Sequence, residues 1–453
     1  MAKMQGLIKG AFILAMGAFL SKLIGAIYRI PLTNVIGAEG LGLYQMVFPI
    51  YCVLLDFAGA GVPSALSKII AERGAGEKTS LEILYTAIKV LSILGLVGTA
   101  LMLTLSSTLA YLQGNSDAML AYIFLAPSVS LVAIASCFRG YFQGKMNMYP
   151  TAITQVGEQV IKLVFGVLFA SLFMPNLPLA VGGATLAVSL SELFALLCLY
   201  LKYKKERKKE QDKVFYKPEK GVFYSNLKLI VKTTVPVTLI GVFIPLSQFI
   251  DSFIIINLLN AYMHSGTILY GLLSGVAVTV INLPVAICYG LSQTTIPLVS
   301  KEKSEQFKNK RSVISLFITF ILSLLGAIIT FIFCPIAVKI LFRSLSTEES
   351  SSVIALIKML APSIVFLALI QTENAVLIGK GKLYFPLIGL IVGIILKIIL
   401  ELILVSKPEF NIYGGAIALI ACYFAICLIN LIVLISAGKK HEDKTTYSGE
   451  YAN

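Results

Sequence analysis

Charged side chains are scarce in this chain of 453 residues: they make up 13% of it, whereas 57% of the residues are hydrophobic. Soluble domains carry about 25% charged residues, so the composition excludes a soluble globular protein and indicates many membrane spans. Tryptophan is absent, and the two histidines, His264 and His441, lie outside the long apolar runs, which argues against histidine chemistry. The 7 cysteines have neither metal-site nor disulfide-framework spacing.

Twelve apolar runs are long enough to cross about 30 Å of hydrocarbon. They lie near residues 7–32, 41–66, 83–110, 118–138, 151–174, 180–201, 226–258, 268–299, 312–341, 353–378, 384–405 and 412–437. The net charge of +14 is concentrated in alternate loops, with nine Lys/Arg between 202 and 220, whereas the opposite loops hold only Arg343 and Lys407. This pattern argues for membrane topology rather than nucleic-acid binding, and the positive-inside rule predicts that both termini are cytoplasmic.

Short sequence matches recur in order along the chain. LAPS occurs at 125–128 and at 360–363, and Lys162 and Lys397 are separated by the same offset. We therefore predict two six-helix halves of parallel topology, which places a substrate site at the interface between halves that rock to give alternating access. The predicted domains are 1–201 and 226–438, joined by a basic linker at 202–225 and followed by a cytoplasmic tail at 439–453.

The stretch SKLIGAIYRIP, residues 21–31, places Lys22 and Arg29 seven residues apart in the first apolar run. Seven residues is about two helical turns, so both cations lie on one helix face. A charge at bilayer depth costs at least roughly 2.5–3.5 kcal/mol, and no acidic residue lies within one turn of either cation. Their partner must therefore come from another helix or from a ligand.

Other charges at membrane depth come in local pairs. Glu158 and Lys162 are four residues apart, as are Lys397 and Glu401 in the reverse order. Each pair is either an internal ion pair that lowers the cost of insertion or a substrate contact. Four further acids lie at depth: Asp56, Glu192, Asp251 and Glu373. Of these, Asp251 is a candidate ion or proton site, or else a counter-ion to Arg29.

Two segments combine proline with small residues near the same end of corresponding helices, DFAGAGVPSALSK at 56–68 and CYGLSQTTIPLVSK at 288–301. Such residues weaken the helical backbone and allow bending during gating. They also allow close helix packing, and their occurrence in both halves favours bending. The candidate hinge residues are Gly59, Gly61, Pro63 and Pro297.

A set of segments spread over nearly the whole chain resembles one family. They are SKLIGAIYRIP, GAEGLGLYQ, GVPSALSK, YPTAITQVGEQVIK, IPLSQFIDSF and NLPVAICYGLSQTTIP, with LAPS, IGKGK and KPEFNIYGGA in the second half. The chain is similar to the multidrug/oligosaccharidyl-lipid/polysaccharide (MOP) exporter superfamily, in particular its stage V sporulation protein B and YtgP-like branch, related to MurJ-type lipid II flippases. The resemblance implies an all-α fold of twelve transmembrane helices, in two pseudo-symmetric bundles around a central cavity.

The resemblance implies a flippase rather than an enzyme, which moves undecaprenyl-diphosphate-linked cell-envelope glycans to the outer leaflet of a bacterial cytoplasmic membrane. In that family, cations on the first helix meet the diphosphate, and Lys22 and Arg29 occupy the matching stretch. A polar motif on the fifth helix and an aspartate on the seventh are matched by Gln155, Glu158, Gln159, Lys162 and Asp251. No cofactor is expected beyond coupling to the membrane potential, H⁺ or Na⁺, with Asp251 and Asp56 as candidate coupling sites, and the protein is expected to act as a monomer.

The chain departs from MurJ-type proteins in three ways. It has twelve predicted spans, as polysaccharide-unit flippases do, where MurJ-type proteins have two further helices. It has Lys22 where arginine is common, and Asp56 where MurJ-type proteins carry a cation. An anionic lipid-linked glycan is therefore the expected substrate class, with lipid II and a polysaccharide unit both open.

Three other functions compete with this interpretation. A cation-coupled multidrug antiporter of the same superfamily would need acids facing its cavity, and Asp56 is the residue that supports it. A membrane-embedded glycosyltransferase would need catalytic acids in a substantial external loop, whereas the external loops here are short. A non-transporting scaffold would tolerate the loss of Lys22 and Arg29.

Overall fold

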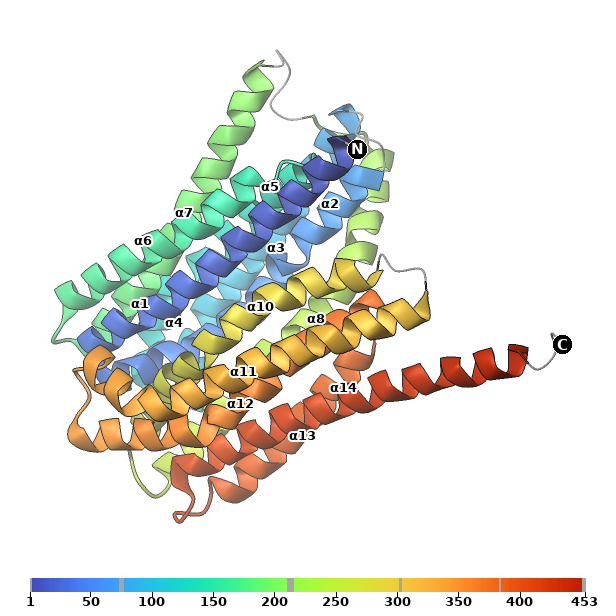
Figure 1. Cartoon of the computed structure of the whole chain (residues 1–453). Coiled ribbons are helices and arrows are strands. Elements are labelled where there is room, and N and C mark those ends of the chain that lie inside the picture. The colour runs from blue at the N-terminus through green and yellow to red at the C-terminus, as the bar shows by residue number, and fades with distance from the viewer. Residues whose placement is uncertain (1, 73–76, 210–215, 301–303, 383, 450–453) are drawn as a thin grey trace. The chain divides into compact units, whose positions relative to one another are not determined.

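A computed structural model describes residues 2–72, 77–209, 216–300, 304–382 and 384–449, and nearly all of them are helical (Figure 1). The helices are α1 (Ala2–Leu55), the π-helix η1 (Asp56–Ala60), α2 (Val62–Glu72), α3 (Glu77–Leu112), the 3₁₀-helix η2 (Ser116–Ala118), α4 (Met119–Leu125), α5 (Pro127–Gly144), α6 (Tyr149–Phe173), α7 (Leu177–Lys209), α8 (Lys220–Asn260), α9 (Gly266–Tyr270), the π-helix η3 (Gly271–Ala277), α10 (Val278–Ser300), α11 (Glu305–Leu341), α12 (Thr347–Gly379), α13 (Phe385–Leu404) and α14 (Asn411–Gly449). No β-strand occurs within these ranges.

Within the described residues, 11 helices are long and apolar enough to cross a membrane, and the first of them, Phe12–Leu55, has 44 residues. This helix is not straight, because Gly37 inside it has φ 68°. The rings of Tyr28 and Tyr44, on either side of Gly37, have centroids 6.4 Å apart. Sixteen residues of straight helix would span about 24 Å, so α1 folds back at Gly37. It contains the first predicted span and the beginning of the second, which continues through η1 into α2. The all-helical fold class is confirmed. The 11 helices account for the twelve predicted spans because the first helix contributes to two of them.

The chain divides into two compact units. Unit 1 comprises Met1–Asn257 and Thr267–Gly271, and unit 2 comprises Leu258–Gly266 and Leu272–Asn453. Most of α8 therefore packs with unit 1, although the sequence repeat assigns it to the second half. The domain boundaries derived from the repeat stay a prediction, and residues 210–215 of the linker and 450–453 of the tail lie outside the described residues.

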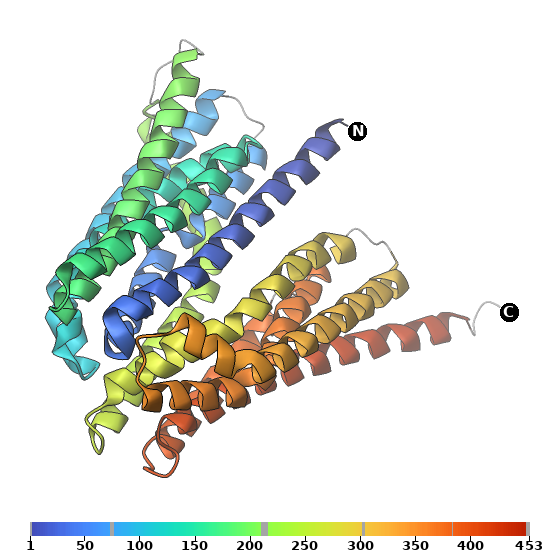
Figure 2. The ribbon, with the colours of Figure 1, turned by 60° about the vertical axis from the view of Figure 1, so that its left-hand side comes forward.

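Small residues bring α1 against α6 in unit 1 (Figure 2). A Cβ added at Gly17 would lie 2.9 Å from Cβ of Ala152, and one added at Gly166 would lie 2.5 Å from Oη of Tyr28. Helix α6 also packs against α7, and α5 contacts α2, α3 and α7. These contacts fix the positions of the charged residues on α1, α5, α6 and α7.

The second part of α1 crosses the segment around α9 at very short range. A Cβ added at Gly42 would lie 2.1 Å from the carbonyl oxygen of Thr267. We expect Gly42→Ala to destabilise the protein by about 1–3 kcal/mol, the usual cost of overpacking, and to lower the midpoint of thermal unfolding in detergent. Gly221→Ala is the matched control, since nothing lies within 4 Å of its added Cβ. An unchanged midpoint for Gly42→Ala would contradict this crossing.

In unit 2, α12 is the central helix, because it packs against α10, α11 and α14, while α13 packs on α14. Val376 and Leu377 of α12 form a buried apolar cluster with Leu434 of α14. The contact between α13 and α14 again uses glycine, because a Cβ added at Gly393 would lie 2.5 Å from Cγ1 of Ile426. This packing encloses the polar residues of α12.

Candidate functional site

The candidate site lies in unit 1, where Lys162 of α6 meets a row of aromatic rings on α1. Nζ of Lys162 lies 5.5 Å from the ring centroids of both Tyr28 and Phe48. The row continues through Tyr44, stacked on Phe48 at 5.3 Å, and Tyr51, at 5.5 Å from Phe48. Because the fold at Gly37 brings the two parts of α1 together, a single lysine can contact rings from both. Such cation–π contacts hold an ammonium group without neutralising its charge.

Arg29 lies next to this row on α1 and is half-buried. The groups that act on it electrostatically include Tyr44, Tyr28 and Cys52. Arg29 is in turn one of the charged groups that act on Lys162. Two cations from different helices are therefore near enough to repel one another within the helices that are apolar enough to cross a membrane.

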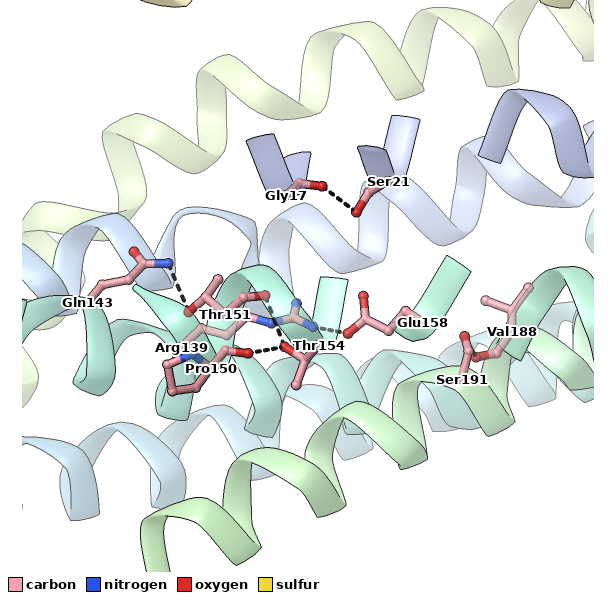
Figure 3. Close-up of polar contacts among 10 residues, drawn as sticks. All are labelled: Gly17, Ser21, Arg139, Gln143, Pro150, Thr151, Thr154, Glu158, Val188 and Ser191. Carbon is pink, nitrogen blue, oxygen red and sulfur yellow. Dashed lines mark hydrogen bonds and ion pairs between the residues drawn. The ribbon is translucent and has the colours of Figure 1, made fainter. Parts of the chain in front are cut away.

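Glu158, one turn before Lys162 on α6, forms an ion pair with Arg139 of α5 (Figure 3). Side-chain exposure is 11% for Arg139 and 8% for Glu158, so the pair is shielded from solvent. An ion pair with Lys162 was one of the two alternatives open for Glu158, the other being a substrate contact. In the structure Glu158 pairs with Arg139 of the neighbouring helix, while Lys162 still acts on it electrostatically. Because Arg139 engages Glu158, Lys162 keeps its contacts with the aromatic row instead.

Glu192 of α7 completes the charged cluster. The charged groups that act on it are Glu158, Arg139 and Lys162. One of its oxygens, Oε2, is buried and has no hydrogen-bond partner among the described residues. Arg29, Lys162, Arg139, Glu158 and Glu192, contributed by four helices, are called the charged cluster below.

The other predicted residues of unit 1 lie around this cluster. Lys22 is exposed on α1, about two turns before Arg29, and is not among the groups that act on Lys162. Oε1 of Gln159 faces Gly25 of α1, where an added Cβ would lie 3.1 Å away. Gln155 is half-buried, and its Oε1 has no hydrogen-bond partner within the described ranges. The structure thus groups Arg29 with Lys162 and places Lys22 at a more exposed position.

Lys397 and Glu401 belong to unit 2, on α13, and are 4% and 0% exposed. Lys397 therefore lies inside its own unit, whereas Lys162 is half-buried in unit 1. The substrate-binding role of Lys397 remains a prediction.

The candidate coupling residues of unit 1 are placed on different elements. Asp56 is half-buried in η1, and its carboxylate faces Gly241 of α8, where an added Cβ would lie 3.4 Å away. Asp251 is 7% exposed on α8. π-Helices such as η1 often occur at functional sites, but a coupling role for either acid remains a prediction.

The candidate hinge residues of unit 1 surround a close helix contact. A Cβ added at Gly59 would lie 2.9 Å from Oγ of Ser136, and one added at Gly140 would lie 3.1 Å from Cα of Pro63. Close packing of η1 and α2 against α5 therefore accounts for Gly59 and for the position of Pro63. Gly61 lies between η1 and α2, and Pro297 lies in α10. Bending at these positions stays a prediction.

Sequence reasoning did not identify several members of the site. Arg139 lies one residue beyond the predicted apolar run 118–138, but in the structure it belongs to α5 and is paired. The aromatic residues Tyr28, Tyr44, Phe48 and Tyr51 were not selected, although Tyr28 adjoins Arg29 and the last three are spaced by about one turn. That helical spacing is the feature of the sequence from which an aromatic row on one helix face could have been predicted. Among the described residues, no group of three or more His, Cys, Asp or Glu is arranged to hold a metal ion.

The chain is similar in sequence to two bacterial proteins and in fold to a transporter of known structure. The chain is 28% identical over 444 residues to stage V sporulation protein B of Bacillus subtilis (strain 168), covering 95% of this chain and 83% of that protein. It is 28% identical over 266 residues to lipid II flippase MurJ of the same organism, covering 54% of this chain and 48% of that protein. Its fold resembles an inward-facing MATE family multidrug resistance transporter of the MOP superfamily, with a TM-score of 0.77, 18% identity, and coverage of 92% and 96% of the two chains.

The membrane-spanning helices define a multi-pass membrane protein, which has the fold of MATE family transporters and is similar in sequence to stage V sporulation protein B and to the lipid II flippase MurJ. Within that class, the chain belongs to the polysaccharide biosynthesis protein family, whose pattern it matches over residues 7–301. The resemblance predicted from the sequence is thereby confirmed.

Proposed function

We propose that this protein flips an undecaprenyl-diphosphate-linked glycan precursor from the inner to the outer leaflet by alternating access. The observation that carries the proposal is the proximity of Arg29 and Lys162 in an aromatic-lined part of unit 1. Two neighbouring cations attract an anion much more strongly at low dielectric than in water. A diphosphate is such an anion, since the guanidinium offers a planar fork and the ammonium a point charge for its oxygens.

The relatives support this substrate class. One is named a lipid II flippase and another a stage V sporulation protein, so both a peptidoglycan precursor and another envelope glycan fit the proposal. Moving such a lipid requires no covalent change, and we propose a transport role rather than an enzymatic one. The cations replace the hydration shell of the diphosphate while it crosses the membrane.

We further propose that the protein acts as a monomer in a bacterial cytoplasmic membrane, with both termini in the cytoplasm. Support comes from the Lys/Arg-rich loops, since the charge bias of short loops sets orientation. No cofactor is proposed. Transport would be driven by the membrane potential, H⁺ or Na⁺, with Asp56 and Asp251 as candidate ion sites of unit 1.

A cation-coupled multidrug antiporter is the second candidate function. The observation that favours it is the buried oxygen of Glu192, which has no hydrogen-bond partner among the described residues and would suit a cationic drug. The two functions differ in the sign of the substrate charge. Export of a cationic dye by cells expressing the protein, without flipping of a diphosphate lipid, would favour the antiporter.

Complementation tests the proposed function directly. The chain is expressed in cells depleted of their lipid II flippase and, separately, in cells that lack a polysaccharide-unit flippase. Restored growth or restored surface polysaccharide supports the proposal and selects the glycan. Failure in both strains, with the protein correctly inserted, would contradict it.

The structure predicts that Lys22 contributes less than Arg29. Lys22 is exposed, whereas Arg29 is half-buried next to Lys162, and an exposed cation gains less from an ionic contact. In a liposome flipping assay, we expect Lys22→Ala to slow flipping by less than about tenfold, the equivalent of 1.4 kcal/mol, and Arg29→Ala to slow it more. Equal losses for the two variants would show that both cations bind the substrate equally.

A further inference from the structure

The exposed side of α7 changes from apolar to basic toward the end of the helix. Leu197 and Leu201 are 49% and 60% exposed, and because they are four residues apart they lie on the same face. Lys205 follows Leu201 by four residues and continues this face, with Lys204 and Lys208 on either side of it. These two leucines and three lysines are called the α7 stripe below.

The opposite side of the same helix segment is held by two neighbouring helices. Tyr203 and Arg207, four residues apart, are both buried. The ring of Tyr203 lies 5.4 Å from that of Tyr141 on α5, and Nη1 of Arg207 lies 2.5 Å from Oε1 of Glu77 on α3. These contacts fix which side of α7 is buried, and the α7 stripe therefore faces outward from unit 1.

The three lysines of the stripe present their charges together. With Leu201 they line a hollow of about 510 Å³. Glu206 is the only acidic residue between positions 201 and 209, and it pairs with Lys202 at 3.3 Å. Within the part of the chain that the structure describes, none of the three lysines of the stripe has an ion-pair partner. The hollow is therefore suited to an anion.

We propose that the α7 stripe binds an anionic phospholipid of the leaflet at which α7 ends, with the phosphate among the lysines and an acyl chain along the leucines. The part of α7 that is apolar enough to cross a membrane extends over Leu177–Lys208, so the lysines lie at one end of a membrane span. Leu197 precedes Lys205 by eight residues, which is about 12 Å of helix. The stripe thus reaches from the headgroups into the hydrocarbon, and lysine side chains extend readily toward the headgroups.

A phospholipid fits the stripe better than a soluble anion does. A soluble polyanion would contact only the lysines, whereas a phospholipid contacts the basic and the apolar part at the same time. Anionic leaflets also attract lysines next to a membrane span. The stripe shares no residue with the charged cluster, so this inference goes beyond the proposed flipping function and does not depend on it.

Lipid retention by the full-length protein in detergent micelles, measured by native mass spectrometry, tests the proposal. The wild type should retain phosphatidylglycerol in preference to phosphatidylcholine, which has a phosphate but no net charge. Lys204→Gln/Lys205→Gln/Lys208→Gln should lose this preference, with a decrease in affinity of roughly fivefold for each lysine. Replacing the same three lysines with arginine should preserve it. Loss of the preference in the arginine variant, or its persistence in the glutamine variant, would overturn the proposal.

A matched variant separates this site from the general effect of net charge. Lys228→Gln/Lys232→Gln/Lys310→Gln removes the same charge from exposed lysines of α8 and α11 and should retain the preference for phosphatidylglycerol. Equal losses in the two glutamine variants would show that net charge alone attracts the lipid, and would overturn the site.

Two competitors test the identity of the occupant. Glycerol phosphate, the soluble headgroup without acyl chains, should not displace phosphatidylglycerol from the wild type. Undecaprenyl diphosphate should displace it no better than a second anionic phospholipid does. Displacement by glycerol phosphate would indicate a site for soluble anions. A preference for undecaprenyl diphosphate that disappears with the three lysines would indicate a capture site for the substrate. Either result would overturn the proposal.

Discussion

Replacing both Arg29 and Lys162 with glutamine is expected to abolish lipid flipping, while the protein still folds and inserts into the membrane. The two side chains repel one another across α1 and α6, whereas Glu192 and Glu158 attract Lys162, so removing both cations takes away a repulsion together with these attractions. Because these effects partly offset one another, the protein is expected to fold, although the cation–π contacts of Lys162 are lost. The anionic substrate, in contrast, loses the charges that replace its hydration shell.

Each single substitution should have a large effect on its own. Truncating one partner of a buried charge pair costs about 2–5 kcal/mol, which corresponds to a loss of roughly 30-fold or more. The assay is flipping of an undecaprenyl-diphosphate lipid in proteoliposomes, with insertion checked in parallel. Lys358→Gln is the matched control, because its ammonium lies 5.6 Å from the ring centroid of Phe331 in unit 2. Normal flipping by a well-inserted Arg29→Gln/Lys162→Gln protein would contradict the proposed binding site.

The second large effect is expected on stability, at the ion pair between Arg139 and Glu158. Both side chains are shielded from solvent, and removing one partner of a buried ion pair typically costs 3–5 kcal/mol because the other charge is left uncompensated. We therefore expect Arg139→Gln to lower the unfolding free energy by about that amount. Arg139→Gln/Glu158→Gln should be destabilised by less than the sum of the single changes.

Reversible unfolding in mixed micelles measures this double-mutant cycle. The exposed pair Lys68–Glu72, at 3.8 Å with both side chains more than 60% exposed, provides the control, and its removal should cost at most about 1 kcal/mol. Additive effects of Arg139→Gln and Glu158→Gln would show that the two residues do not stabilise one another.

The membrane-spanning architecture could be predicted from the sequence because hydropathy and loop charge are local properties. The fold of α1 at Gly37 confirms this, since the sequence already separated the first two spans there. The partner of Glu158 could not be predicted in the same way. Lys162 is its neighbour along the helix, whereas Arg139 is brought to it by the packing of α5 near α6, which no local pattern encodes.

The two cations of the first helix illustrate the same limit. Helical spacing places Lys22 and Arg29 on one face, but burial differs between them because α1 folds back only around the Arg29 end. Lys162, selected from the sequence for its position beside Glu158, joins Arg29 through tertiary contacts.

Binding of undecaprenyl diphosphate to the purified protein tests the central claim most directly, since it requires neither energy coupling nor a particular glycan. The wild type should bind the diphosphate more tightly than undecaprenyl monophosphate and far more tightly than the neutral alcohol. Arg29→Gln/Lys162→Gln should lose this preference while Lys358→Gln keeps it. Equal affinity of the wild type for the diphosphate and the neutral alcohol, or an unchanged preference in Arg29→Gln/Lys162→Gln, would contradict the account.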